Sequence, residues 1–292
     1  MKNTEKKSFQ NFASLPFFQK KSSFVGLILI LILIFCSIFS GVITKYNPNS
    51  QGDLLLTRYQ PPSVEHPFGT DKFGRDIFSR ILYGGRISLS IAFSVVILSL
   101  TVGLFYGIIS GYWGGWIDTI MMRVLDFLLA FPAIFLIITL IALFNLNHWF
   151  LIPLLALTGW METARIVRAE ILSIKEREFV LAAKGMGIHP FRIIIVHLIP
   201  NIITPVLVAA PLKIAEVILL ESALSFLGIG VQPPTPSWGA IINDGRESLL
   251  NAWWISTFPG IFISITVMSF NLISDGVKDV INSNLTNHFS DH

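Results

Sequence analysis

Long stretches without a single charged residue constrain this chain more than any other feature. Uncharged runs cover residues 22–44, 87–117, 127–161, 193–212 and 248–274. A helix needs about 20 mostly apolar residues to cross the roughly 30 Å hydrocarbon core of a bilayer. The runs therefore predict an integral membrane protein rather than a water-soluble globule.

Composition agrees with this prediction and excludes several functions. Only 13% of the 292 residues are charged and 53% are hydrophobic, whereas soluble domains carry about 25% charged residues. The net charge of +3 does not suggest a nucleic-acid partner, and the single cysteine, Cys36, excludes an intramolecular disulfide. The chain has no G-x-x-x-x-G-K-[ST] phosphate loop, no metal-ligand cluster and no nucleophile–base set. We therefore expect no enzymatic activity, no bound cofactor and no metal site, so energy for any transport must come from a partner.

The run at 127–161 is too long for one crossing, and it contains the polar stretch Asn145-Leu146-Asn147-His148. A loop is favourable there because water can satisfy the backbone. Splitting the run gives an all-α, polytopic membrane protein with about six transmembrane helices. The predicted spans lie at about 23–45, 87–110, 118–143, 149–168, 200–224 and 255–277.

Basic residues predict the orientation and the organisation of the chain. Five lysines precede the first span, which favours a cytoplasmic N-terminus, and six spans then return the C-terminus to the cytoplasm. The predicted segments are a cytoplasmic tail at 1–22, a first transmembrane anchor helix at 23–45, an external loop at 46–86, a five-helix core at 87–280 and a cytoplasmic tail at 281–292. The core includes a polar cytoplasmic loop at 174–198.

That polar loop is the most informative segment. Residues 174–186 are expected to form a short helix, which Gly185 and Gly187 end because glycine tolerates the backbone of a tight turn. Pro190 suits the first turn of a second helix, and Pro200 suits the start of the fifth span. From these residues alone, the loop is either a docking site for another protein or an ordinary connection.

The order Ala182-Ala183, then Gly187, then Pro200 resembles the "EAA" loop of ABC importer permeases. Leu181 stands where that family usually has glutamate, and Glu178 lies three residues earlier. In the family, the loop forms a coupling helix that docks in a groove of the cytoplasmic ATPase. The resemblance implies ATPase-coupling roles for Glu178, Ala182, Ala183, Lys184, Gly187 and Pro200.

Longer blocks carry the resemblance further. Residues 66–90, 111–132, 224–246 and 258–282 are similar to blocks of the dipeptide, oligopeptide and nickel permeases, and the chain resembles their "C-type" subunit. This resemblance implies the type I ABC importer permease fold in the cytoplasmic membrane of a bacterium or archaeon. It also implies a second homologous permease subunit, two cytoplasmic ATPase subunits that use ATP, and an external substrate-binding protein.

Peptides are the expected cargo, and nickel or a metal–chelator complex is the alternative within the same architecture. A stand-alone secondary transporter is the alternative from another class. Such a protein is expected to contain structural repeats and paired ion sites within the membrane. The two halves of this sequence show no obvious repeat.

Charges inside the predicted fifth span are the remaining candidates. Lys213, Glu216 and Glu221 interrupt an apolar helix, and charge within a membrane normally faces a protein interior or an aqueous path. They either line the translocation path or pack helices together. In the third span, Arg123 and Asp126 are three residues apart and are expected to form a structural pair, with ligand contact as the alternative.

Two external segments also have open interpretations. The charged and glycine-rich stretch at 66–86 either meets the external binding protein or an entry to the pore, or folds on itself with internal ion pairs. The proline-rich stretch at 231–240 predicts a stiff external loop with Trp238 near the membrane interface. That loop either gates and contacts the binding protein or forms a structural cap.

Overall fold

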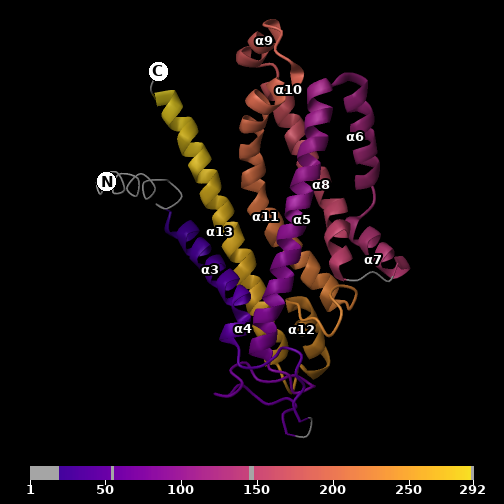
Figure 1. Cartoon of the computed structure of the whole chain (residues 1–292), viewed down its shortest axis with the longest axis vertical. Coiled ribbons are helices and arrows are strands. Elements are labelled where there is room, and N and C mark those ends of the chain that lie inside the picture. Colours follow the sequence, from indigo (N-terminus) through magenta and orange to yellow (C-terminus); the bar gives the residue numbers. More distant parts are fainter. Residues whose placement is uncertain (1–19, 54–55, 145–147, 291–292) are drawn as a thin grey trace. The chain divides into compact units, whose positions relative to one another are not determined.

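The computed structural model describes residues 20–53, 56–144 and 148–290, and the predicted N-terminal tail lies almost entirely outside them. The described residues contain no β-strand beyond an isolated bridge between Thr70 and Asp76, so the all-α prediction is confirmed. The helices, labelled in Figure 1, are α3 (Lys21–Ile38), α4 (Ser40–Ile43), α5 (Ile77–Trp113), α6 (Gly115–Leu129), α7 (Ala133–Phe144), α8 (Leu151–Ile174), α9 (Glu178–Gly185), α10 (Pro190–Ile193), α11 (Ile199–Phe226), α12 (Trp238–Gly245) and α13 (Trp254–Ser290).

The structure does not confirm six separate spans. Within the described residues, four helical stretches are long and apolar enough to cross a membrane: α3, α5, residues 190–226 and residues 254–280. The pair α6 and α7 adds a fifth if it counts as one span, but it is bent by 74° at residues 130–132. Helix α8, at the place of the predicted fourth span, carries four charged residues: Glu162, Arg165, Arg168 and Glu170.

Two predicted boundaries also change. Helix α5 begins at Ile77, ten residues before the expected start, and its 37 residues extend for about 55 Å, which exceeds the hydrocarbon core. The helix predicted at 174–186 is shorter, because α8 continues to Ile174 and α9 begins only at Glu178.

The chain divides into two compact units, each with its own packing. Unit 1 comprises residues 1–93, 146–151 and 211–292, and unit 2 comprises residues 94–145 and 152–210.

In unit 1, α3 lies along α13 (Figure 1). Gly26 allows this close approach, since a Cβ there would lie only 2.8 Å from both the Leu272 Cβ and the Ser269 carbonyl oxygen. Helix α12 packs against α13 as well. The remaining face of α3 exposes large apolar side chains such as Phe35 and Leu31, as expected for a helix that meets lipid.

In unit 2, the crossing of α5 and α8 is unusually close. Gly103, Gly107 and Gly111 recur every four residues along α5 and face α8. A Cβ on Gly107 would lie 2.6 Å from the Ala164 carbonyl oxygen, and one on Gly111 would lie 2.9 Å from the Ile171 Cβ. Small residues at this spacing allow two helix backbones to meet without a layer of side chains between them.

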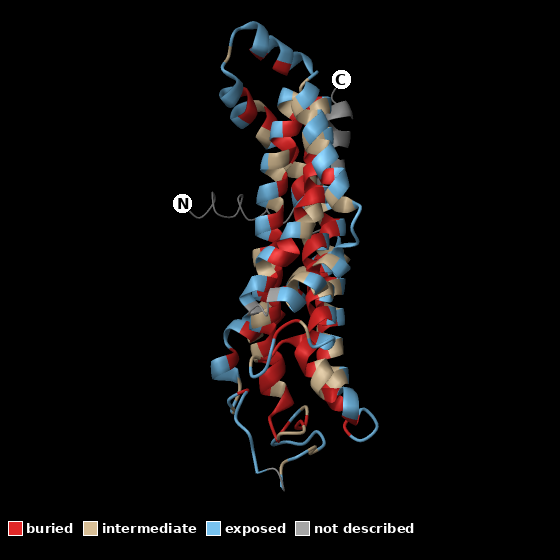
Figure 2. Cartoon of the chain, turned by 90° about the vertical axis from the view of Figure 1, so that its right-hand side faces the viewer, coloured by how far each residue is buried: buried red, intermediate tan, exposed pale blue. Residues whose placement is uncertain are grey.

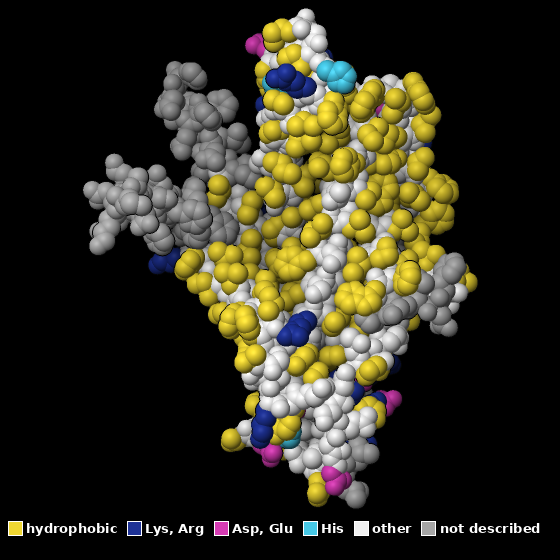
Figure 3. Space-filling view, viewed as in Figure 1, with side chains coloured by type: hydrophobic (Ala, Val, Ile, Leu, Met, Phe, Trp, Pro, Cys, Tyr) yellow, Lys and Arg dark blue, Asp and Glu magenta, His cyan; other side chains and the backbone are white. Residues whose placement is uncertain are grey.

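The molecular surface fits a bilayer. Figure 3 shows hydrophobic side chains over most of the helices on the visible face, with few charged side chains among them. Exposed apolar residues occur in both units, for example Phe105 on α5 and Leu219 on α11. A water-soluble monomer rarely exposes apolar patches this extensive.

Candidate functional site

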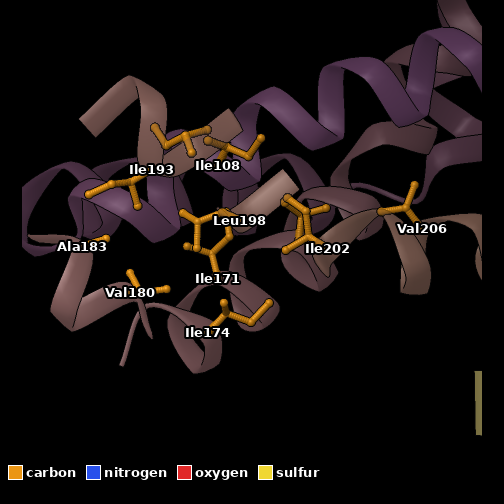
Figure 4. Close-up of a cluster of buried hydrophobic side chains, with 11 residues drawn as sticks. Ile108, Ile171, Ile174, Val180, Ala183, Ile193, Leu198, Ile202 and Val206 are labelled. Atoms are coloured by element: carbon orange, nitrogen blue, oxygen red, sulfur yellow. The ribbon is translucent and has the colours of Figure 1, made fainter. Parts of the chain in front are cut away.

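Helix α9 is fixed to unit 2 by one of its sides. Val180 is fully buried and Ala183 is 2% exposed, and both belong to a hydrophobic cluster that includes residues of five other helical segments. Figure 4 shows Val180 and Ala183 beside Ile171 and Ile174 of α8. The cluster consists of Ile108, Val167, Ile171, Ile174, Val180, Ala183, Ile193, Ile194, Leu198, Ile202 and Val206.

The other side of α9 is exposed. Glu178, Ala182 and Lys184 are exposed, as are Leu181 at 52% and Met186 at 73%. In Figure 2, the segment that holds α9, at the top of the view, is coloured mostly as exposed, with a few buried positions. The two predicted alanines therefore differ: Ala183 packs inward against its own unit, and only Ala182 faces outward.

The turn after α9 depends on backbone conformation. Gly187 has φ +72°, a left-handed conformation that side chains with a Cβ rarely adopt. Its N–H donates to the Lys184 carbonyl at 3.0 Å, and the Ile188 N–H donates to the Ala183 carbonyl at 3.1 Å, which completes the end of the helix. A Cβ on Gly187 would meet no atom within 4 Å, so the conformation rather than crowding favours glycine.

The chain then enters one nearly continuous helix. Pro190 occupies the first turn of α10, as predicted, and a π-helical turn at Ile194–Leu198 leads into α11. Pro200 is the second residue of α11 rather than the start of a separate span. Proline has no N–H to donate to the carbonyl four residues earlier, which accounts for irregular helix just before it.

Ion pairs in unit 2 differ from the predicted one. Asp126 pairs with Arg165 of α8, with Oδ1 and Nη2 2.5 Å apart, instead of with its neighbour Arg123. A second pair, Asp118 and Arg168, also joins α6 to α8, and the sequence does not predict it. The sequence marks these residues only as charges within apolar helices. It does not indicate which residues pair, because the partners are far apart in sequence.

In unit 1, the three charged candidates of α11 have different surroundings. Lys213 is buried and Glu216 is exposed, whereas Glu221 is fully buried. The Ser88 hydroxyl donates to Glu221 Oε2 at 3.0 Å, and the Ser225 hydroxyl donates to Oε1 at 2.8 Å. This arrangement favours a packing role for Glu221.

The same network reaches the loop after α11. The Ser88 oxygen accepts the N–H of Trp238 at 3.3 Å, and the Ser225 oxygen accepts the N–H of Val231 at 3.0 Å. Trp238 is fully buried: it opens α12 and donates from Nε1 to the Ile81 carbonyl at 3.0 Å.

The charged stretch before α5 folds on itself, as one of its two interpretations predicted. Arg75 Nε lies 2.6 Å from Asp71 Oδ2, and His66 Nδ1 lies 2.9 Å from Asp76 Oδ1. Asp244, at the end of α12, accepts hydrogen bonds from Nη2 of both Arg75 and Arg80, at 2.9 and 3.0 Å. These charges are mostly buried and are occupied with one another.

Comparisons with known proteins identify the family. Residues 103–287 match the family described as the inner membrane component of binding-protein-dependent transport systems. Residues 13–62 match the N-terminal transmembrane domain of oligopeptide transport permease C.

Individual relatives agree over most of their length. A putative peptide transport system permease protein of Brucella suis is 42% identical over 91% of this chain and 89% of its own length. A dipeptide transport system permease protein of Alkalihalophilus pseudofirmus is 40% identical over 90% of this chain and 86% of its own. An oligopeptide transport system permease protein of Haemophilus influenzae is 40% identical over 95% of this chain and 89% of its own length.

The family match covers more than half of the chain, and it agrees with a helical structure that contains several apolar spans. The resemblance inferred from the sequence blocks is thereby confirmed. This chain belongs to the inner membrane components of binding-protein-dependent transport systems, a family of multi-pass transport permeases.

Proposed function

We propose that this chain is one permease subunit of an ATP-driven importer for dipeptides or oligopeptides, and that loop 174–198 couples it to separate ATPase subunits. The observation that carries the proposal is the two-sided helix α9, which is fixed to unit 2 by Val180 and Ala183 and exposes its other side. A partner that binds the exposed side moves α9 together with the core beneath it. The relatives support the cargo, because their names specify peptide, dipeptide or oligopeptide transport.

The proposed assembly contains this chain, a second homologous permease subunit, two cytoplasmic ATPase subunits and an external binding protein that delivers the peptide. Binding and hydrolysis of ATP by the ATPase subunits switch access to the path from outside to inside. The loop must then face the cytoplasm, and the excess of lysine in the first 21 residues supports a cytoplasmic N-terminus. This chain performs no covalent chemistry in that scheme.

Five exposed residues in and just after α9 have specific roles in this proposal. Ala182 lets the partner approach closely, since its side chain is small and points away from the unit. Glu178 and Lys184 offer a carboxylate and an ammonium group for polar contacts. Leu181 and Met186 add apolar area of the kind that protein interfaces bury.

Replacing Gly187 with valine tests the loop. A β-branched residue at φ +72° costs about 1–2 kcal/mol or more, so the turn should change conformation and α9 should lose its register. We expect the Gly187→Val chain to insert into the membrane but to lose ATPase co-purification and peptide uptake. Gly185→Ala is the matched control, because that residue is helical and a Cβ there meets nothing within 4 Å.

Normal uptake by the Gly187→Val complex contradicts the coupling role of the loop. The wider proposal is tested by reconstituting this chain with and without its partners and ATP. Peptide transport by the chain alone would instead support a stand-alone transporter.

A further inference from the structure

Three consecutive residues at the end of α5 contact three different parts of unit 2. The Ser110 hydroxyl donates to Asp118 of α6, and the Gly111 carbonyl accepts from Lys175 Nζ at 3.1 Å, just after the end of α8. The ring of the next residue, Tyr112, lies 5.6 Å from Lys184 Nζ of α9. The end of α5 is therefore the place where α6, α8 and α9 meet.

The strongest contact at this place is the pair Asp118 and Arg168. Arg168 donates from Nε to Asp118 Oδ1 and from Nη2 to Oδ2, both at 2.5 Å, in the two-pronged geometry that guanidinium and carboxylate groups favour. The side chains are only 14% and 31% exposed, respectively. Asp118 also lies in the first turn of α6, where the helix dipole stabilises a negative charge. The pair joins the start of α6 to α8.

Helix α6 leads directly to the bent part of unit 2. After α6, the chain turns by 74° through Phe131 and Pro132 into α7. A cavity of about 220 Å³ lies at this bend and is lined largely by apolar side chains. Its lining includes Leu128, Pro132, Leu136, Leu157 and Met161.

A second pair between the same two helices provides a built-in comparison. Asp126 and Arg165 also join α6 to α8, with the same residue types, but their side chains are 52% and 51% exposed. The protein does not enclose this pair, so it constrains the positions of α6 and α8 less than an enclosed pair does. Of the two pairs, Asp118–Arg168 is the more buried. It is also the one that contacts the end of α5, through Ser110, where Tyr112 contacts α9.

We propose that Asp118 and Arg168 are positioning residues that lock α6 to α8 behind the coupling loop, so that displacement of α9 is passed to the bend between α6 and α7. This inference rests on the proposed coupling function. Without the pair, α9 still binds the ATPase, but α6 no longer follows α8, and ATP is hydrolysed without a matching movement of the bend.

The test uses the complete importer reconstituted in lipid vesicles with its binding protein, and it measures ATP hydrolysed per peptide imported. We expect Asp118→Asn and Arg168→Gln to raise this ratio by about tenfold, within the usual range of coupling between sites. Arg168→Lys should give an intermediate ratio, because lysine keeps the charge but not the two-pronged geometry. Asp126→Asn and Arg165→Gln, in the exposed pair, should stay within about twofold of the unmodified complex.

The ratio separates positioning from simple damage. A variant that only misfolds loses uptake and hydrolysis in proportion, so its ratio stays unchanged, and that result overturns the inference. Equal effects at the shielded and exposed pairs also overturn it. ATPase co-purification is measured in parallel: its retention by Asp118→Asn with a raised ratio supports the inference. Failure of the unmodified chain to bind ATPases contradicts the proposed function itself.

Discussion

Helix α9 in unit 2 and the segment 66–80 in unit 1 both carry charged residues. The charged side chains of α9 are exposed, whereas most of those in the segment 66–80 are buried. On α9, Glu178 and Lys184 are exposed, while Val180 and Ala183 are buried in an apolar cluster. The helix is therefore held by hydrophobic packing, and its polar groups remain on the surface.

In the segment 66–80, charged side chains are buried in the interior of the unit. Asp71, Arg75 and Arg80 are almost fully buried and form one network with Asp244. Buried charges require partners, and Asp71 and Asp244 supply carboxylates to both arginines. The charged groups of this segment therefore stabilise the segment itself. Glu178 and Lys184 of α9 instead remain accessible from outside the unit. Charge content alone does not distinguish the two cases; the direction of the side chains does.

The largest effect should come from removing one buried charge. Asp71→Asn removes one of the two carboxylates that pair with Arg75 and Arg80 in the structure, so we expect a loss of about 3–5 kcal/mol in the free energy of unfolding. Unfolding in mixed micelles measures it.

Asp279→Asn is the control for Asp71→Asn, because it breaks the exposed pair with Lys20, whose atoms are 2.7 Å apart, and should cost less than about 1 kcal/mol. A comparable cost for both variants means that burial does not set the value of these charges.

An intermediate effect should follow from weakening the attachment of α9. Val180→Ala removes two buried methyl groups, and we expect the free energy of local opening of α9 to fall by about 2 kcal/mol. Hydrogen exchange of the α9 amides reports this opening. Leu181→Ala, at the neighbouring exposed position, should change it by less than about 0.5 kcal/mol. If the two variants lower the free energy of local opening equally, α9 is not attached mainly through its buried side.

The smallest effect on stability should come from an exposed charge of α9. Glu178→Gln should leave the free energy of unfolding within about 0.5 kcal/mol of its original value, since the side chain is exposed. ATPase affinity should nevertheless fall by about two- to fivefold, the value of one exposed ion pair. Equilibrium binding of the ATPase to vesicles measures it. A large loss of stability without a loss of affinity would assign Glu178 to the interior and remove the contrast with Asp71.

The sequence was informative wherever a feature is local. Uncharged runs gave the helical membrane class, and Gly187 gave the turn, because both depend on the residues themselves. The number of spans is less predictable. The span predicted at 118–143 contains most of α6 and α7 but gives no sign of the 74° bend before Ala133, and α8 carries charges that pair with residues of α6.

Contacts distant in sequence were beyond such reasoning. Arg75 meets Asp244 across 169 residues, and Arg168 meets Asp118 across 50. No periodic pattern encodes these partners, because only the folded chain brings them together. The different directions of Ala182 and Ala183 were likewise set by the cluster under α9, which includes residues from Ile108 to Val206.

The glycine contact between α5 and α8 has a mechanical consequence. Where backbones touch at Gly103, Gly107 and Gly111, no flexible side chains lie between the helices to absorb a small displacement. Sliding one helix past the other would force carbonyl oxygens against Cα atoms, so the two rods turn or tilt as one. A displacement of one end of this helix pair is therefore expected to displace the other end by a similar amount.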